Sequence, residues 1–168
     1  MSKPDGGLGD TEPIQLTMGK DGDGDKEMDL GVSWSRDPGF VYWIDGNDNS
    51  VKRKKMGEEA LNARMIWTST IGDIYNIQVI DAWVFVTGDS TNSLTKMSLN
   101  GENVKTFITG IGSVTGLDVT AWNLVSASPK GYKLFFTSKA TGSVYSCHDN
   151  GDDMQELITD LYEPNDVV

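Results

Sequence analysis

Cysteine and histidine are almost missing from this sequence of 168 residues, which has one of each, at Cys147 and His148. A lone cysteine excludes an internal disulfide framework and any metal site built from several cysteines. Neighbours along a strand point to opposite faces, so this adjacent pair does not by itself make a nucleophile and its base. We therefore expect no catalytic residue here, but a histidine in a surface turn and a half-buried cysteine.

Long apolar runs are also missing. The longest candidate, "IQVIDAWVFV", is interrupted by Asp81 and falls short of the roughly 18 residues that a spanning helix needs. The first residues, "MSKPDGGLGDTEP", lack the apolar core of a secretory signal peptide. We expect no membrane insertion by this segment, and either a cytosolic protein or an internal piece of a larger one.

Positive charge is scarce, with 14 Lys and Arg against 25 Asp and Glu and a net charge of -11. Nucleic acids and anionic membranes are negative and would repel such a chain, so we expect no nucleic-acid partner and favour partners with basic patches. One basic run, Lys52 to Lys55, stands against this background. In a strand its members alternate faces, which favours exposed positions on an outer strand, with a patch for an acidic ligand as the alternative.

Residues 1–29 are rich in Asp, Glu and Gly and poor in apolar residues, which predicts a flexible, disordered acidic segment. Its "DGDGD" run offers oxygen ligands at the alternating positions that calcium accepts. An EF-hand loop counted from this run fails, because Lys26 replaces the turn glycine and Val32 replaces the bidentate glutamate. No other cofactor is predicted. The calcium candidates are Asp21, Asp23 and Asp25.

From about residue 30 onward, short apolar or β-branched runs alternate with Gly, Asn, Asp and Ser clusters, which predicts an all-β fold. One unit recurs, in "VYWIDGNDNSVKRKKMG", "VFVTGDSTNSLTKMSLNG" and "LFFTSKATGSVYSCHDNG". Each copy holds four strand-length segments, and copies recur at roughly 45 residues, the signature of a propeller blade. The aligned residues are Tyr42, Phe85 and Phe135, then Val51, Leu94 and Val144, then Gly57, Gly101 and Gly151.

The end of each copy supports further expectations. Asn100-Gly101 and Asn150-Gly151 predict two-residue hairpin turns, because both residues accept a positive φ. The aligned aromatic residues and Phe136 are expected in the core. Apolar pairs follow each glycine, and Trp67 and Trp122 have no equivalents among the copies. The pairs are Met65-Ile66, Phe107-Ile108 and Leu157-Ile158.

The copies resemble the YWTD repeat of the low-density lipoprotein receptor family, most closely the Wnt co-receptor branch. The second strands read "VYWID", "VFVTG" and "LFFTS", and the inner strands read "LGVSW" (30–34), "IQVID" and "LDVTA". The resemblance implies a β-propeller with about three four-stranded blades, half of a six-bladed ring, over residues 30–168. The expected blades are 30–72, 73–115 and 116–163, with a fourth starting at 164–168. The motif residues are Tyr42, Trp43, Asp45, Phe85, Thr87, Phe135 and Thr137, with the three aligned glycines.

In that family the motif's threonine and aspartate tie neighbouring blades together. Only Asp45 keeps the aspartate, which Gly88 and Ser138 replace, so the resemblance implies looser joints at two blades. Half a ring also leaves two open flanks, through which copies could associate.

The resemblance implies a non-enzymatic, extracellular protein-binding module of a cell-surface receptor that acts in endocytosis or as a signalling co-receptor. Its ligand would be a secreted or cell-surface protein, met by the 46–50, 89–92 and 139–142 loops and the links between blades. One alternative is a calcium-dependent, lactonase-like propeller hydrolase, for which Asp81 and Asp118 are the available carboxylates. Another is a truncated fragment with no independent function. The protein-binding candidates are Asp48, Asn49, Trp67, Trp122 and Lys139.

Overall fold

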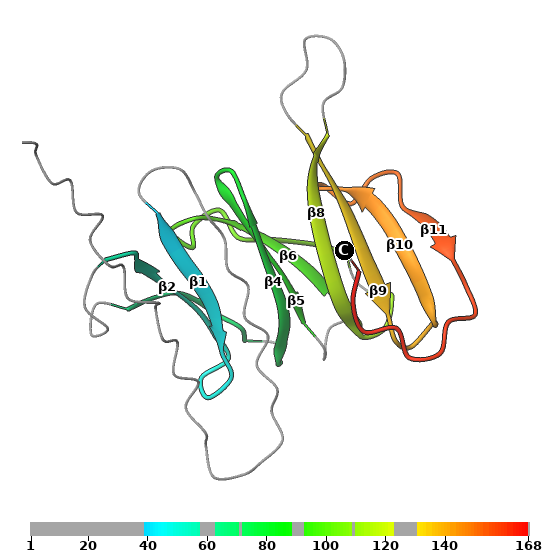
Figure 1. Ribbon diagram of the computed structural model, residues 1–168, viewed down its shortest axis with the longest axis horizontal. Helices are drawn as coiled ribbons and strands as arrows, with labels where there is room; N and C mark the ends of the chain where they lie inside the picture. The colour runs from blue at the N-terminus through cyan, green and yellow to red at the C-terminus, as the bar shows by residue number, and fades with distance from the viewer. Residues whose placement is uncertain are drawn as a thin grey trace, which may run out of the picture.

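The computed structural model describes residues 39–57, 63–70, 72–88, 93–108, 110–122 and 131–167, which form three antiparallel sheets side by side (Figure 1). The first sheet contains β1 (Phe40–Asp45), β2 (Ser50–Lys55) and β3 (Arg64–Thr68). The second contains β4 (Ile74–Ile80), β5 (Trp83–Gly88), β6 (Ser93–Ser98) and β7 (Lys105–Ile108). The third contains β8 (Val114–Trp122), β9 (Gly131–Ser138), β10 (Ser143–His148) and β11 (Gln155–Ile158).

Within these ranges there is no helix, which confirms the all-β prediction. None of the described segments could therefore cross a membrane as an apolar helix. Each sheet is a simple meander, in which strands adjacent in sequence are adjacent in space. The acidic segment with its calcium candidates and the expected inner strand of the first blade (30–34) lie outside the described residues.

The strand register confirms the internal repeat. The residue two positions after each aligned aromatic residue pairs with the first apolar residue of the next strand. The pairs are Ile44 with Val51, Thr87 with Leu94 and Thr137 with Val144. The same side chains therefore point the same way in every sheet, because a slip of one residue would turn them to the other face.

Two apolar clusters fill the spaces between the sheets. One joins the first and second sheets around Tyr42, and the other joins the second and third around Phe85. Phe136 is buried in the second cluster. The prediction of a core position for Phe135 was wrong, because Phe135 is only half-buried. Tyr42 and Phe85 face the next sheet in the chain, and the described residues place no further sheet against Phe135.

A β-bulge recurs in the outer strand of every sheet. Val51 pairs with Trp67 while Lys52 pairs with Met65, so Ile66 is the extra residue of the first sheet. Phe107 and Leu157 are the extra residues of the other two. This shifts the first apolar pair by one position from the sequence alignment. Trp67 therefore has equivalents after all, because it occupies the position of Ile108 and Ile158.

The three aligned glycines share one backbone conformation, with φ of 82° at Gly57, 83° at Gly101 and 91° at Gly151. The turns are longer than the predicted two-residue type, because the Gly101 amide donates to the Ser98 carbonyl at 2.9 Å and β7 starts only at Lys105. Neither Asn100 nor Asn150 is among the residues with positive φ. Glycine is needed at these points because other residues adopt such φ values at a cost.

The motif threonines act within their own sheets. The Asn76 amide donates to Thr87 Oγ1 at 3.1 Å, and the Gly116 amide donates to Thr137 Oγ1 at 2.7 Å. Both amides belong to inner strands whose register shifts at that point, so the buried hydroxyls replace lost ladder bonds. Asp45 likewise bonds to its own sheet, through Lys52 Nζ. The described contacts therefore place these side chains within their own blades, whereas the resemblance implies a role between blades.

Basic side chains on β2 and β6 tie the sheets together instead. Arg53 Nη1 donates to the Leu99 carbonyl at 2.6 Å, and Lys96 Nζ lies 2.5 Å from Asp149 Oδ2. Both residues hold the same register position, opposite the aligned aromatic residue. Arg53 and Lys52 thus serve opposite faces, as the alternation within the basic run predicts.

Candidate protein-interaction face

Loops and links gather at one end of the three sheets, the lower end in Figure 1. We call this surface the loop face, and it has two kinds of segment. The β1–β2 and β9–β10 loops each join two neighbouring strands of one sheet. The links join one sheet to the next, or follow the last strand, β11. Its described residues are 46–49, 69–70, 72–73, 110–113, 139–142 and 159–163.

Backbone hydrogen bonds fasten these segments to one another. The Ser69 amide donates to the Asn49 carbonyl at 2.8 Å, and the Leu161 amide donates to the Gly142 carbonyl at 2.8 Å. Asn49 and Gly142 hold the same place before their strands and both have positive φ, 50° and 65°. Asparagine tolerates this conformation better than most residues. Asn49 thus shapes the loop through its backbone.

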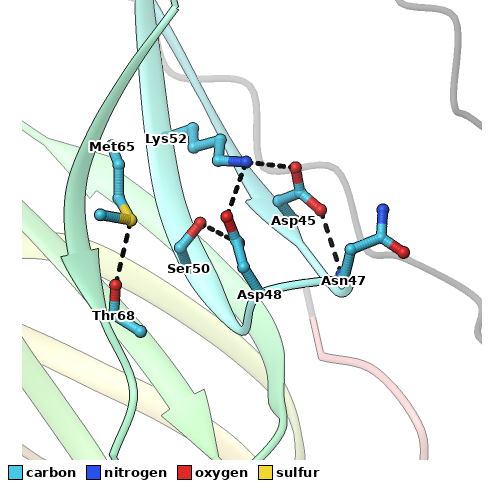
Figure 2. A network of polar contacts seen from close by, with 7 residues as sticks. All are labelled: Asp45, Asn47, Asp48, Ser50, Lys52, Met65 and Thr68. Carbon is cyan, nitrogen blue, oxygen red and sulfur yellow. Dashed lines mark hydrogen bonds and ion pairs between the residues drawn. The ribbon is translucent and has the colours of Figure 1, made fainter.

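A network of charged groups stabilises the β1–β2 loop (Figure 2). Lys52 Nζ lies 2.5 Å from Asp45 Oδ2 and 2.9 Å from Asp48 Oδ2. The Ser50 hydroxyl donates to Asp48, and the Asn47 amide donates to Asp45 Oδ1 at 3.1 Å. One ammonium group therefore connects two carboxylates, and the loop is held at both its beginning and its end.

The network shifts the proton affinity of its members. Burial alone would raise the pKa of Asp48, but the Ser50 hydrogen bond and the Lys52 ammonium outweigh it and lower the pKa. Burial would lower the pKa of Lys52, but the two carboxylates outweigh it and raise the pKa. Both groups therefore stay charged across the neutral range, and the Asp48 side chain remains 45% exposed.

Acidic side chains outnumber basic ones around the loop face. Lys139 is exposed and lies 3.7 Å from Glu163, so its charge is partly balanced by a neighbouring link. On or next to the loop face lie Asp45, Asp48, Asp73, Asp160, Glu163 and Asp166, against Lys52 and Lys139.

Trp67 packs into the fold beside the loop face. It is half-buried and contacts the apolar cluster between the first and second sheets. It also lines a shallow crevice with Val86 and Thr87 that has room for about one water molecule. A site of this size suits no small-molecule ligand. Trp67 thus contributes apolar surface at the edge of the face.

The other candidates are divided between the two ends of the molecule. Asp48, Asn49 and Trp67 come together at the first sheet, and Lys139 lies on the same face at the third. Trp122 pairs through its backbone with Gly131 at the opposite end of β8, and its side chain is outside the described residues.

The groups considered for catalysis have structural surroundings. Cys147 is fully buried rather than half-buried, and burial raises the pKa of its thiol to about 12. His148 Nε2 lies 3.6 Å from Asp153 Oδ2 in the turn. Asp81 accepts a hydrogen bond from the Tyr132 hydroxyl at 3.0 Å. Within the described ranges, no three His, Cys, Asp or Glu side chains group as metal ligands, so the lactonase alternative gains no ligand set.

No family model matches the chain, and no curated protein matches it either. Among solved structures, it is similar to a chain in the crystal structure of a nidogen/laminin complex, with a TM-score of 0.64 and 18% sequence identity. The fold is that of a partial β-propeller. The likeness covers 82% of this chain and 51% of the other. This chain therefore spans about half the length of the chain that it matches. At this identity the comparison supports the sequence resemblance at the level of fold.

Sequence reasoning missed several partners on the loop face. Lys52 was assigned to an exposed run, and Glu163 was given no role. The hairpin offered a signal for the first, because Asp45 and Lys52 flank a short loop on paired strands. A serine at the start of β2, β6 and β10 is another unnoticed repeat, and all three copies are buried. These serines are Ser50, Ser93 and Ser143.

Proposed function

We propose that this chain is a non-enzymatic protein-binding module that uses its loop face to bind a secreted or cell-surface protein. The observation that carries the proposal is the hydrogen-bonded construction of that face, in which a loop is fastened to a link in the first blade and again in the third. A surface that is already ordered loses little conformational entropy when a partner binds. A surface whose described crevice has room for about one water molecule suits a macromolecule better than a small ligand.

The charge of the face indicates the chemistry of the partner. Asp48 is exposed and ionised, and carboxylates predominate among the neighbouring segments. Complementary charge accelerates association and selects partners more than it adds affinity. The ligand we propose therefore presents a basic patch, and its binding weakens as salt is added.

The wider setting is proposed from the likenesses. The similar chain comes from a complex named for two proteins, nidogen and laminin, which supports a protein partner for this fold. The "VYWID" strand and its two relatives resemble receptor propellers of the lipoprotein-receptor family. We propose an extracellular module of a cell-surface receptor, in endocytosis or as a signalling co-receptor.

The test is a binding selection with the purified chain against a displayed library of secreted and cell-surface ectodomains. The double variant Asp48→Ala/Lys139→Ala removes one charge of each sign from the loop face. We expect ligands enriched by the unmodified chain to bind this variant at least about tenfold more weakly. Charge loss at the other end should have no such effect.

The matched control is Asp152→Ala/Lys105→Ala, which also removes one charge of each sign, from exposed positions at the opposite end. Equal losses in both double variants would move the binding site away from the loop face. Enrichment of no ectodomain at all would favour the alternative of a fragment without independent function.

A further inference from the structure

The two contacts between blades are built from the same pair of positions. In each, the bulged residue of an outer strand presents its backbone carbonyl to the hairpin glycine of the next blade. A Cβ atom at Gly101 would lie 1.8 Å from the Ile66 oxygen, and one at Gly151 would lie 2.9 Å from the Phe107 oxygen. The bulge and the glycine are two halves of one repeated joint.

Each half of this joint also occurs unmatched, at opposite flanks of the chain. Leu157 is the bulged residue in the outer strand of the third blade, and its side chain is exposed. Gly57 is the hairpin glycine of the first blade, and a Cβ atom placed on it has no described atom within 4 Å. Among the described residues, the bulge at one flank and the glycine at the other are therefore unmatched.

Apolar residues beside the free bulge are exposed where their equivalents are buried. Ile108 is 6% exposed between the second and third blades, whereas Ile158 at the same position is 51% exposed. Ile111, three residues further on, is 9% exposed, whereas Leu161 is 38% exposed. The third blade thus keeps the apolar surface that the second blade buries against its neighbour.

Not every exposed apolar residue near this flank belongs to the joint. Met154 is exposed, but its equivalent Val104 is exposed too, although the third blade follows the second. Met154 is therefore expected to stay in solvent whatever covers Ile158. It provides a control position a few residues away from the flank.

We infer that the open flank of the third blade docks against the first blade of a second copy of this chain, head to tail. The occupant follows from complementarity, because the chain itself carries the glycine that matches its own free bulge. Two copies supply about the length of the similar propeller chain, of which one copy covers 51%. Two identical joints then close a pair of half-propellers into one ring. The inference does not depend on the proposed ligand of the loop face.

At the open flank a serine takes the place of the basic residue of the two joints. Ser146 holds the register position of Arg53 and Lys96, opposite the aligned aromatic residue. Those two residues bond to the next blade at positions two before its hairpin glycine. The Ser146 hydroxyl is buried and has no hydrogen-bond partner in the described chain. In the closed pair this position lies opposite Lys55 of the second copy.

The test is the solution mass of the full chain, measured by light scattering over a range of concentrations. We expect a pair of twice 18.3 kDa. Gly57→Ala should weaken it by about tenfold or more, because the new methyl group meets the Leu157 carbonyl of the other copy. Gly110→Ala is its matched control, because Gly110 has the same φ of 82° and equally open surroundings. Ile158→Glu should give monomers, and its control Met154→Glu should not.

Near-ultraviolet circular dichroism on each variant reports whether the fold is retained. Mixing Gly57→Ala with Ile158→Glu should partly restore pairing, since one of the two joints is then intact on both sides. A monomer at every concentration would overturn the inference and assign the flank to another protein or to more of a longer chain. Pairing that survives Ile158→Glu, or masses that keep growing with concentration, would overturn the closed head-to-tail pair.

Discussion

The two joints between blades differ in how a basic side chain crosses them. Between the first and second blades, Arg53 donates to a backbone carbonyl and lies 4.7 Å from the centre of the Phe40 ring. Between the second and third, Lys96 pairs with a carboxylate and lies 4.0 Å from the centre of the Trp83 ring. The repeat therefore preserves the position of a cation and an aromatic ring, while the acceptor changes. The two joints thus share the positions of their groups but differ in the group that pairs with the cation.

The largest expected effect is at the hairpin glycines, where the two joints differ in closeness. Gly101→Ala should lower the free energy of unfolding by about 3 kcal/mol or more, because its Cβ would lie 1.8 Å from the Ile66 oxygen. Gly151→Ala should cost less, about 2 kcal/mol, because the Phe107 oxygen is 2.9 Å away. Urea unfolding followed by tryptophan fluorescence measures both.

Gly110→Ala is the control for backbone strain alone and should cost about 1 kcal/mol. The comparison of the joints fails if Gly101→Ala and Gly110→Ala destabilise the chain equally.

An intermediate effect is expected at the cations. Lys96→Met should cost about 2 kcal/mol, because it leaves the partly buried Asp149 carboxylate unpaired. Arg53→Met should cost about 1 kcal/mol, because the Leu99 carbonyl still accepts from the Tyr42 hydroxyl at 3.3 Å. Added salt should reduce the first cost and leave the second unchanged. The measurement is chemical unfolding at low and high ionic strength.

A double-mutant cycle with Asp149→Asn isolates the ion pair from other losses at Lys96. A coupling energy near zero would show that Lys96 acts through the Trp83 ring and not through its carboxylate partner.

At neutral pH, an effect as small as that of Arg53→Met is expected at Tyr132, in the second joint. Burial, followed by the hydrogen bond to Asp81, raises the pKa of its hydroxyl from 10.0 to about 12. The stabilising contribution is fully present below pH 10.0, the ordinary value, and is lost as pH rises toward about 12. Tyr132→Phe should cost about 1 kcal/mol at pH 7 and reduce the loss of stability at high pH.

Burial also raises the pKa of Tyr42 in the first joint, so part of the alkaline loss should remain in Tyr132→Phe. Unfolding free energies between pH 8 and about pH 12 check this. An unchanged alkaline slope would mean that the second joint does not depend on the Tyr132 hydroxyl.

The repeat was predictable from sequence because its signal is periodic. Tyr42 and Phe85 stand at fixed distances from the residues that pair beside them, and the hairpin glycines follow at nearly constant spacing. The bulges were not predictable, because an extra residue inside the apolar stretch "MIW" looks the same as a regular strand. That is why Trp67 seemed to have no equivalent.

The loop face could be predicted only in outline. The loops are visible as turn residues, and the order of the strands brings the loops that hold Asp48 and Lys139 to one end of the sheets. The partners that hold the face are backbone carbonyls, such as those of Asn49 and Gly142, and every residue has one. Such partners leave no residue-type signal, so the fastening of the loops to the links emerged only from the structure.

The repeated bulge also limits how the outer strands can meet other chains. A β-strand with one free side can serve as a template on which an incoming strand adds through its backbone. In β11 the extra residue Leu157 interrupts the ladder one residue before the strand ends, and β7 is interrupted in the same way. An added strand would find no long, even row of donors and acceptors there. The fold therefore leaves its faces open to partners while making its outermost strands poor sites for fibre-like growth.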